Sequence, residues 1–191
     1  MPDLVVRYFD KAGPANTDEA VALGMKRAVE LGVGTVVVAT CSGETAVKAH
    51  EAADRAVFGG RLVAVTHHVG FSGPNEDDME AGAREALQGM GFRVVTGTHA
   101  LSGPERSFRN TFKGVYPLEM VASTLRMFGQ GVKTCVECAV MAADAGAVRS
   151  GEEAVFIAGT GSGADTACVL VPAHMNNFLA LKVREIICKP R

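Results

Sequence analysis

The chain has 191 residues, 48% of them hydrophobic and 21% charged, which is typical of one globular domain with a buried core, here predicted over residues 1–191. A formal net charge of −2 without a charged block argues against a nucleic-acid surface or a polybasic membrane segment. The apolar stretches are strand-sized and the N-terminus lacks a signal-peptide profile, so we expect a cytoplasmic protein whose partner is a small molecule.

Hydrophobic periodicity and glycine breaks predict alternating strands and helices in the first half of the chain. In chain order they are a strand at residues 5–9, a helix over 18–31 with Asn16 or Thr17 as N-cap, a strand at 35–40, a helix over 44–58, a strand at 62–66, a helix over 75–89 and a strand at 92–96.

A long polar segment, residues 98–116, follows; residues 99–106 within it are a candidate lid, because long loops in compact domains commonly cover or form a site. The remaining predictions are two helices, two strands joined as an antiparallel hairpin, and an edge strand in the tail, which would also permit a homo-oligomer. Their ranges are 117–128, 132–145, 153–158, 166–172 and 185–189.

Three of the apolar runs end on a threonine followed by polar sequence, at Thr40, Thr66 and Thr96. The spacings of 26 and 30 residues match strand-helix-strand units, and continuous Val/Leu runs suit buried parallel strands. Such connections bring the carboxyl ends of the strands to one edge of the sheet, where open α/β folds bind ligands. We therefore predict the functional site at this edge.

The loop after the first of these strands contains Ser42, Gly43, Glu44 and Thr45, just before an alanine-rich helix. Free amides at the helix start and the two hydroxyls suit a phosphate. Ser42 acting only as a helix cap is an equally good interpretation, and the charge of Glu44 would have to point away from a phosphate.

A second glycine-rich loop, GTGSGA at residues 159–164, matches a dinucleotide-binding pattern in spacing only. The pattern requires a helix next, whereas residues 166–172 are predicted to form a strand. The loop is either a flexible hairpin or backbone that lies close to a ligand.

His67 and His68 follow the predicted strand at 62–66, and His99 follows the one at 92–96, so we predict that His67 or His99 contacts a ligand. No metal site is predicted there, because adjacent side chains such as His67 and His68 point to opposite sides in extended backbone. Arg106, with Arg109 and Lys113, is either a phosphate clamp or a solvated charge. Cys135 and Cys138 lie within a predicted helix, which favours packing over redox chemistry. The five cysteines are expected to be free thiols.

Several blocks of the chain resemble, in order, the C-terminal α/β domain of pyruvate kinase and, more closely, stand-alone archaeal and bacterial proteins related to that domain. The matching blocks are residues 40–46, 63–71, 101–106, 128–133, 141–146, 163–167 and 185–191.

This resemblance implies a three-layer α/β/α sandwich whose sheet is mostly parallel with one antiparallel strand. It also implies that Thr40, Ser42, Gly43 and Thr45 match a loop that holds a phosphate of the sugar-bisphosphate effector in full-length pyruvate kinase. The stand-alone relatives look like binders of flavin mononucleotide (FMN). Pyruvate kinase performs its chemistry in a barrel domain, for which 191 residues leave no room, so kinase activity is not expected.

The leading hypothesis is a binder of a phosphorylated small molecule, first of all FMN. The alternatives are a non-catalytic module that senses a sugar phosphate, a flavin-dependent enzyme, and a structural oligomerisation domain. Candidate catalytic groups are His67, His99 and Arg106. Candidate cofactor contacts are Thr40, Ser42, Gly43, Glu44, Thr45, Thr66, His67, Gly70, Phe71, Gly159, Thr160, Gly161, Gly163 and Asp165.

Overall fold

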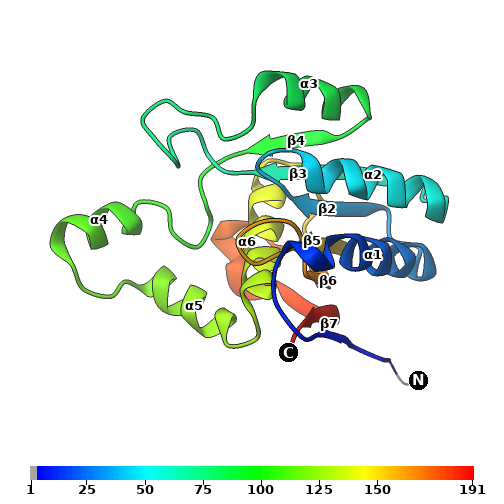
Figure 1. Ribbon diagram of the computed structural model, residues 1–191. Coiled ribbons are helices and arrows are strands. Elements are labelled where there is room, and N and C mark those ends of the chain that lie inside the picture. The colour runs from blue at the N-terminus through cyan, green and yellow to red at the C-terminus, as the bar shows by residue number, and fades with distance from the viewer. Residues whose placement is uncertain (1–3) are drawn as a thin grey trace.

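The computed structural model describes residues 4–191 and consists of one sheet with helices on both faces (Figure 1). Its elements in chain order are β1 (Arg7–Phe9), η1 (Pro14–Asn16), α1 (Thr17–Leu31), β2 (Thr35–Ala39), α2 (Glu44–Ala56), β3 (Arg61–Thr66), α3 (Ala81–Gly89), β4 (Arg93–Thr96), α4 (Glu105–Phe112), α5 (Pro117–Arg126), α6 (Gln130–Asp144), β5 (Ala154–Ala158), β6 (Thr166–Val171), η2 (Met175–Ala180) and β7 (Lys182–Pro190).

The sheet has seven strands in the order β1-β7-β6-β5-β2-β3-β4. β6 runs antiparallel to both of its neighbours, β5 and β7, whereas every other neighbouring pair is parallel. The predicted sheet, mostly parallel with one antiparallel strand, is therefore confirmed, and so is the antiparallel pairing of β5 with β6.

The two faces of the sheet carry separate cores, as the alternation of side chains along β2 illustrates. Val36 and Val38 pack with the alanines of α1 and α2, while Val37 between them packs against α6 on the opposite face. Helices α1, α2 and α3 cover the first face and α6 covers the second (Figure 1). Both cores are built largely from Val and Ala side chains, and this arrangement is the predicted three-layer sandwich.

Glycine permits the closest approach between α1 and the sheet. A Cβ atom at Gly24 would lie 2.9 Å from Cδ1 of Ile157 on β5 and 3.3 Å from Cβ of Ala167 on β6, so a larger residue would require these side chains or the helix to shift. The same helix ends at Gly32, whose φ of 64° is the left-handed conformation usual at a helix end. Glycines thus set both the position and the end of α1.

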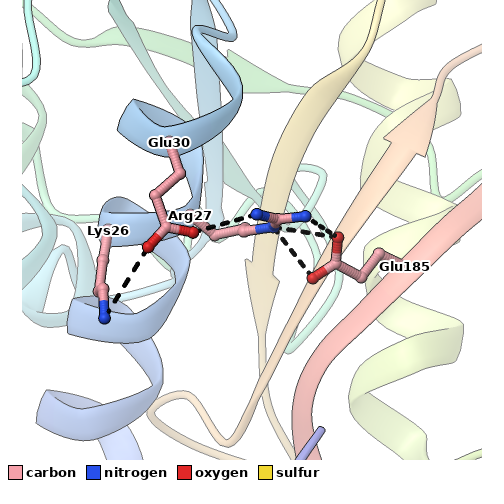
Figure 2. A network of polar contacts seen from close by, with 4 residues as sticks. All are labelled: Lys26, Arg27, Glu30 and Glu185. Carbon is pink, nitrogen blue, oxygen red and sulfur yellow. Dashed lines mark hydrogen bonds and ion pairs between the residues drawn. The ribbon is translucent and has the colours of Figure 1, made fainter. Parts of the chain in front are cut away.

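A charged network connects α1 to β7 (Figure 2). The Arg27 guanidinium donates to both carboxylate oxygens of Glu185, with Nη2 lying 2.9 Å from Oε2, and it also donates to Glu30 at 3.0 Å. The side chains of Arg27 and Glu185 are only 20% and 16% exposed. These hydrogen bonds raise the pKa of Arg27 above its ordinary value, the contact with Glu185 contributing most.

Three predicted elements differ in part from the structure. The helix expected over residues 75–89 begins only at Ala81. Asn75 has a φ of 64°, and the Asp77 carboxylate accepts a hydrogen bond from the amide of Met79, so local polar groups hold residues 75–80 in a loop. The 98–116 segment contains the amphipathic helix α4.

The third difference concerns the tail strand, which was expected at an edge. β7 lies inside the sheet, between β1 and β6, because the N-terminal strand pairs in parallel with it. The edge strands are β1 and β4. The expected pairing of the tail across a subunit interface therefore loses its basis, and the prediction of a homo-oligomer stays a prediction.

Within residues 4–191, no helix combines the length and the hydropathy that crossing a membrane requires.

Candidate functional site

The loops at the carboxyl ends of β2, β3, β4 and β5, together with α6, line one cavity of about 600 Å³. This volume lies within the range of small-molecule sites, about 300–1,000 Å³. The cavity brings together most of the residues predicted from the sequence, namely Thr40, Ser42, Glu44, Thr45, Thr66, His67, Phe71, His99, Arg106, Gly159, Gly161 and Gly163. The convergence expected from the strand spacing is thus observed.

Four predicted residues are not among the lining side chains. Gly43 lies behind the loop, where its amide donates to Thr40 Oγ1 at 3.0 Å. Gly70 donates to the carbonyl of Glu76, and Thr160 accepts from the Ser162 amide within the glycine-rich loop. Asp165 is fully buried; it accepts from the Gly13 amide at 2.9 Å and from Thr166 Oγ1 at 2.8 Å, which ties the glycine-rich loop to the N-terminal segment.

Of the three strand-ending threonines, two line the cavity. Thr96 instead accepts a hydrogen bond from Arg84 at 3.0 Å. Thr66 is 2% exposed, and its hydroxyl is the sole buried side-chain oxygen or nitrogen without a hydrogen-bond partner in the part of the chain described. The wall of the cavity therefore holds an unsatisfied hydrogen-bonding group. Leaving such a group buried without a partner costs about 1–3 kcal/mol of stability.

The loop between β2 and α2 leads directly into the start of a helix. Gly43 adopts a φ of 95° and serves as N-cap of α2, so the first amides of the helix have no partner within the helix. Ser42 Oγ lies 3.4 Å from the Glu44 amide, a long hydrogen bond that makes capping the weaker of the two interpretations of Ser42. Thr45 is buried, whereas Glu44 is exposed and free to turn away from an anion.

Aromatic rings form a cluster on the β3 side of the cavity. The His67 ring lies 3.9 Å from Phe71 and 5.0 Å from His99, measured between ring centroids. The Arg106 guanidinium of α4 lies over Phe71, 4.9 Å from the ring centroid, in cation-π geometry. The segment predicted as a lid thus contacts the aromatic cluster.

The surroundings shift the pKa values of His99 and of two nearby groups, Cys41 and Asp78. Burial lowers the pKa of His99 to about 4, partly opposed by Glu137, so its imidazole is neutral at pH 7. Burial raises the pKa of the Cys41 thiol. Hydrogen bonds from Ser72 and then His67 lower the pKa of Asp78, whose Oδ2 lies 2.6 Å from His67 Nδ1.

Helix α6 contributes a wall that the sequence interpretation did not include. Lys133 and Glu137 are buried, form an ion pair one helical turn apart and line the cavity together with Cys138 and Met141. A lysine and a glutamate four residues apart within an otherwise apolar helix were the available signal.

Other predicted groups have structural partners. Cys135 is buried and its thiol donates to the Phe156 carbonyl at 3.3 Å, and all five cysteines are free, as predicted. Arg109 pairs with Glu119 at 2.7 Å, and Lys113 is exposed and donates to the Asn110 carbonyl. Neither of these two cations lines the large cavity.

A second cavity of about 90 Å³ shares three cationic lining residues with the first: Arg106, Arg126 and Lys133. Arg126 hydrogen-bonds Gln130 at 2.8 Å. The boundary between the two cavities therefore carries three cationic side chains, of which Lys133 is paired with Glu137.

Comparison with known proteins identifies a family and similar solved structures. The family model described as "Pyruvate kinase, alpha/beta domain" matches residues 18–170. The chain is also similar to a Cryptosporidium parvum pyruvate kinase solved in complex with ADP, at 15% identity and a TM-score of 0.37. That match covers 93% of this chain but only 25% of the pyruvate kinase.

Proposed function

Because this chain belongs to the pyruvate kinase alpha/beta domain family, we propose that it binds a phosphorylated small molecule in the large cavity, with FMN as the leading ligand. The observation that carries the proposal is the convergence of the loop at the start of α2, an aromatic cluster and a glycine-rich loop on one cavity of about 600 Å³. Pyruvate kinase chemistry is not proposed, since the resemblance places it in a separate barrel domain.

The phosphate is assigned to the loop before α2. Ser42 and Thr45 line the cavity and carry hydroxyls that could contact the phosphate, and the amides at the start of α2 add donors and the positive end of the helix dipole. Thr40 holds the loop through its bond to the Gly43 amide and is thus a positioning residue.

The planar part of the ligand is assigned to the region between Phe71 and the glycine-rich loop. Gly161 has open space where a side chain would lie, so its backbone can approach a flat ring, whereas the corresponding space at Gly159 is filled by the backbone of Gly163. The unpartnered hydroxyl of Thr66 supplies a hydrogen-bonding group on the same wall. FMN, when bound, would supply hydride or electron transfer at its ring system.

The proposal is tested by identifying the bound ligand and then by titration. Protein expressed with riboflavin should show flavin absorbance after purification, and mass spectrometry of the released ligand should identify FMN. Titration of ligand-free protein with FMN and riboflavin then isolates the contribution of the phosphate. FMN should bind more tightly than riboflavin by about tenfold to 100-fold, since hydrogen bonds to a charged group contribute about 1.5–3 kcal/mol.

Two variants locate the phosphate. Ser42→Ala and Thr45→Val should each weaken FMN binding by about tenfold or more and leave riboflavin binding unchanged. Ser107→Ala, an exposed serine on α4 outside the cavity lining, is the matched control. Equal loss of FMN and riboflavin binding would place the phosphate elsewhere. If the protein bound none of the three ligands FMN, ADP and a sugar bisphosphate, the proposed function would be excluded.

A flavin-dependent enzyme is the second candidate, favoured by the proton-transfer groups on the cavity wall. The neutral imidazole of His99 and the buried Lys133–Glu137 pair line the same space as the proposed cofactor site. Photoreduced, FMN-loaded protein mixed with candidate oxidants would test this function. If none of these compounds reoxidised the bound FMN faster than it reoxidises free FMN, the non-catalytic sensing module would be favoured.

A further inference from the structure

Three side chains with different metal-binding groups meet beside the cavity. Cys41 follows β2, His67 follows β3 and Asp78 lies in the loop before α3. The thiol sulfur, one ring nitrogen and one carboxylate oxygen all lie within 4.8 Å of one another. All three side chains are half-buried, and Cys41 and His67 line the cavity.

We propose that Cys41, His67 and Asp78 form a binding site for a divalent transition-metal ion of the Zn²⁺ class. Thiolate, imidazole and carboxylate are the ligands that Zn²⁺ takes in proteins, whereas Mg²⁺ and Ca²⁺ prefer oxygen alone. Three protein ligands with one open position are the pattern of zinc sites that bind water or substrate.

The contact between two of the ligands supports the assignment. In the metal-free protein the His67–Asp78 hydrogen bond of 2.6 Å holds the nitrogen and the oxygen together, and a metal ion would replace the proton between them.

The open position would face the cavity, because two of the three ligands lie on its wall. All three ligands come from the protein, so the metal site does not require a second ligand molecule.

Co²⁺ is a suitable probe, because a bound thiolate gives an intense charge-transfer absorption. Chelator-treated, ligand-free wild-type protein should bind one equivalent of Co²⁺ with this absorption, and Zn²⁺ should displace it. Cys41→Ser should abolish the charge-transfer absorption. His67→Gln and Asp78→Asn should each weaken binding by at least about tenfold to 100-fold, and circular dichroism verifies that each variant is folded.

Two controls match the ligands. His68→Gln changes the neighbouring histidine, whose ring nitrogen contacts the Val69 carbonyl at 2.8 Å, and Cys138→Ala removes the other thiol on the cavity wall. Both should retain the absorption. Absence of the absorption in the wild type, its persistence in Cys41→Ser, or unchanged affinity in Asp78→Asn would overturn the proposal. Because no flavin is present, this result is independent of FMN binding.

Discussion

Lys133 and Glu137 form a buried ion pair on one face of α6, where their side chains are 9% and 7% exposed. The second carboxylate oxygen of Glu137 accepts the Leu101 amide at 3.0 Å, so the pair also anchors the segment that follows β4. One charged network therefore connects the wall of the cavity with the chain that leads to α4.

Breaking this pair from one side should cost more stability than removing it. Glu137→Leu leaves the Lys133 charge and the Leu101 amide without their partner, which should lower the free energy of unfolding by about 3–5 kcal/mol. The Lys133→Met/Glu137→Leu double variant should lose less than the sum of the two single variants. Urea unfolding followed by circular dichroism measures all three. Additive losses would show that the two charges do not interact.

Gly43 is expected to be required for its backbone conformation and not for its size. A Cβ atom there would meet Ala83 and Leu87 at 3.6 Å, an ordinary contact, but the φ of 95° is unfavourable for any residue with a side chain. Gly43→Ala should lower the free energy of unfolding by about 1–2 kcal/mol. Gly82→Ala is the control, because Gly82 has open space and no positive φ, and it should change stability by less than about 1 kcal/mol, in the stabilising direction.

His99 should make stability depend on pH on the acid side. The unfolded chain protonates this histidine near its ordinary pKa of 6.5, whereas burial keeps the folded protein from doing so until about 4. The unfolded state therefore binds more protons between these values, and stability should fall as the pH falls from about 6.5 to about 4. The charged or titratable groups that act on it are His67, His68, Arg106 and Glu137.

Melting temperatures of the metal-free protein across this pH range test the prediction. His99→Gln should show a shallower decline than the wild type, and the difference between the two curves isolates this one group. Parallel curves would mean that His99 is protonated equally in the folded and unfolded states.

The parts of the fold that could be predicted from the sequence are those with strong local patterns. Runs such as TVVVA and LVAVT lie on β2 and β3, where both faces of the sheet are buried, so continuous apolar sequence translated directly into strands. The partner of β7 was not predictable in this way. Its neighbour β1 comes from the opposite end of the chain, and such a pairing leaves no signal in local sequence.

The same distinction holds for the site. Loops that follow strands were found, because a parallel sheet brings their starts to one edge. Asp78 was missed since its role depends on the path of the 67–80 loop, which places it against His67. Lys133 and Glu137 were missed because a lysine and a glutamate four residues apart are also common on a solvated helix face, so their sequence does not reveal that they are buried.

The Arg27–Glu185 contact offers a prediction with a control on the same helix. Glu185→Gln removes the negative charge from a bidentate, largely buried pair and should lower the free energy of unfolding by about 1.5–3 kcal/mol, because hydrogen bonds between charged groups are the strong ones. Lys26 contacts Glu30 at 3.8 Å and is 74% exposed, so Lys26→Ala should change stability by less than about 0.5 kcal/mol. Urea unfolding at low and high salt measures the change in the free energy of unfolding for both variants. Equal losses of stability in Glu185→Gln and Lys26→Ala would show that burial of the Arg27 pair contributes nothing.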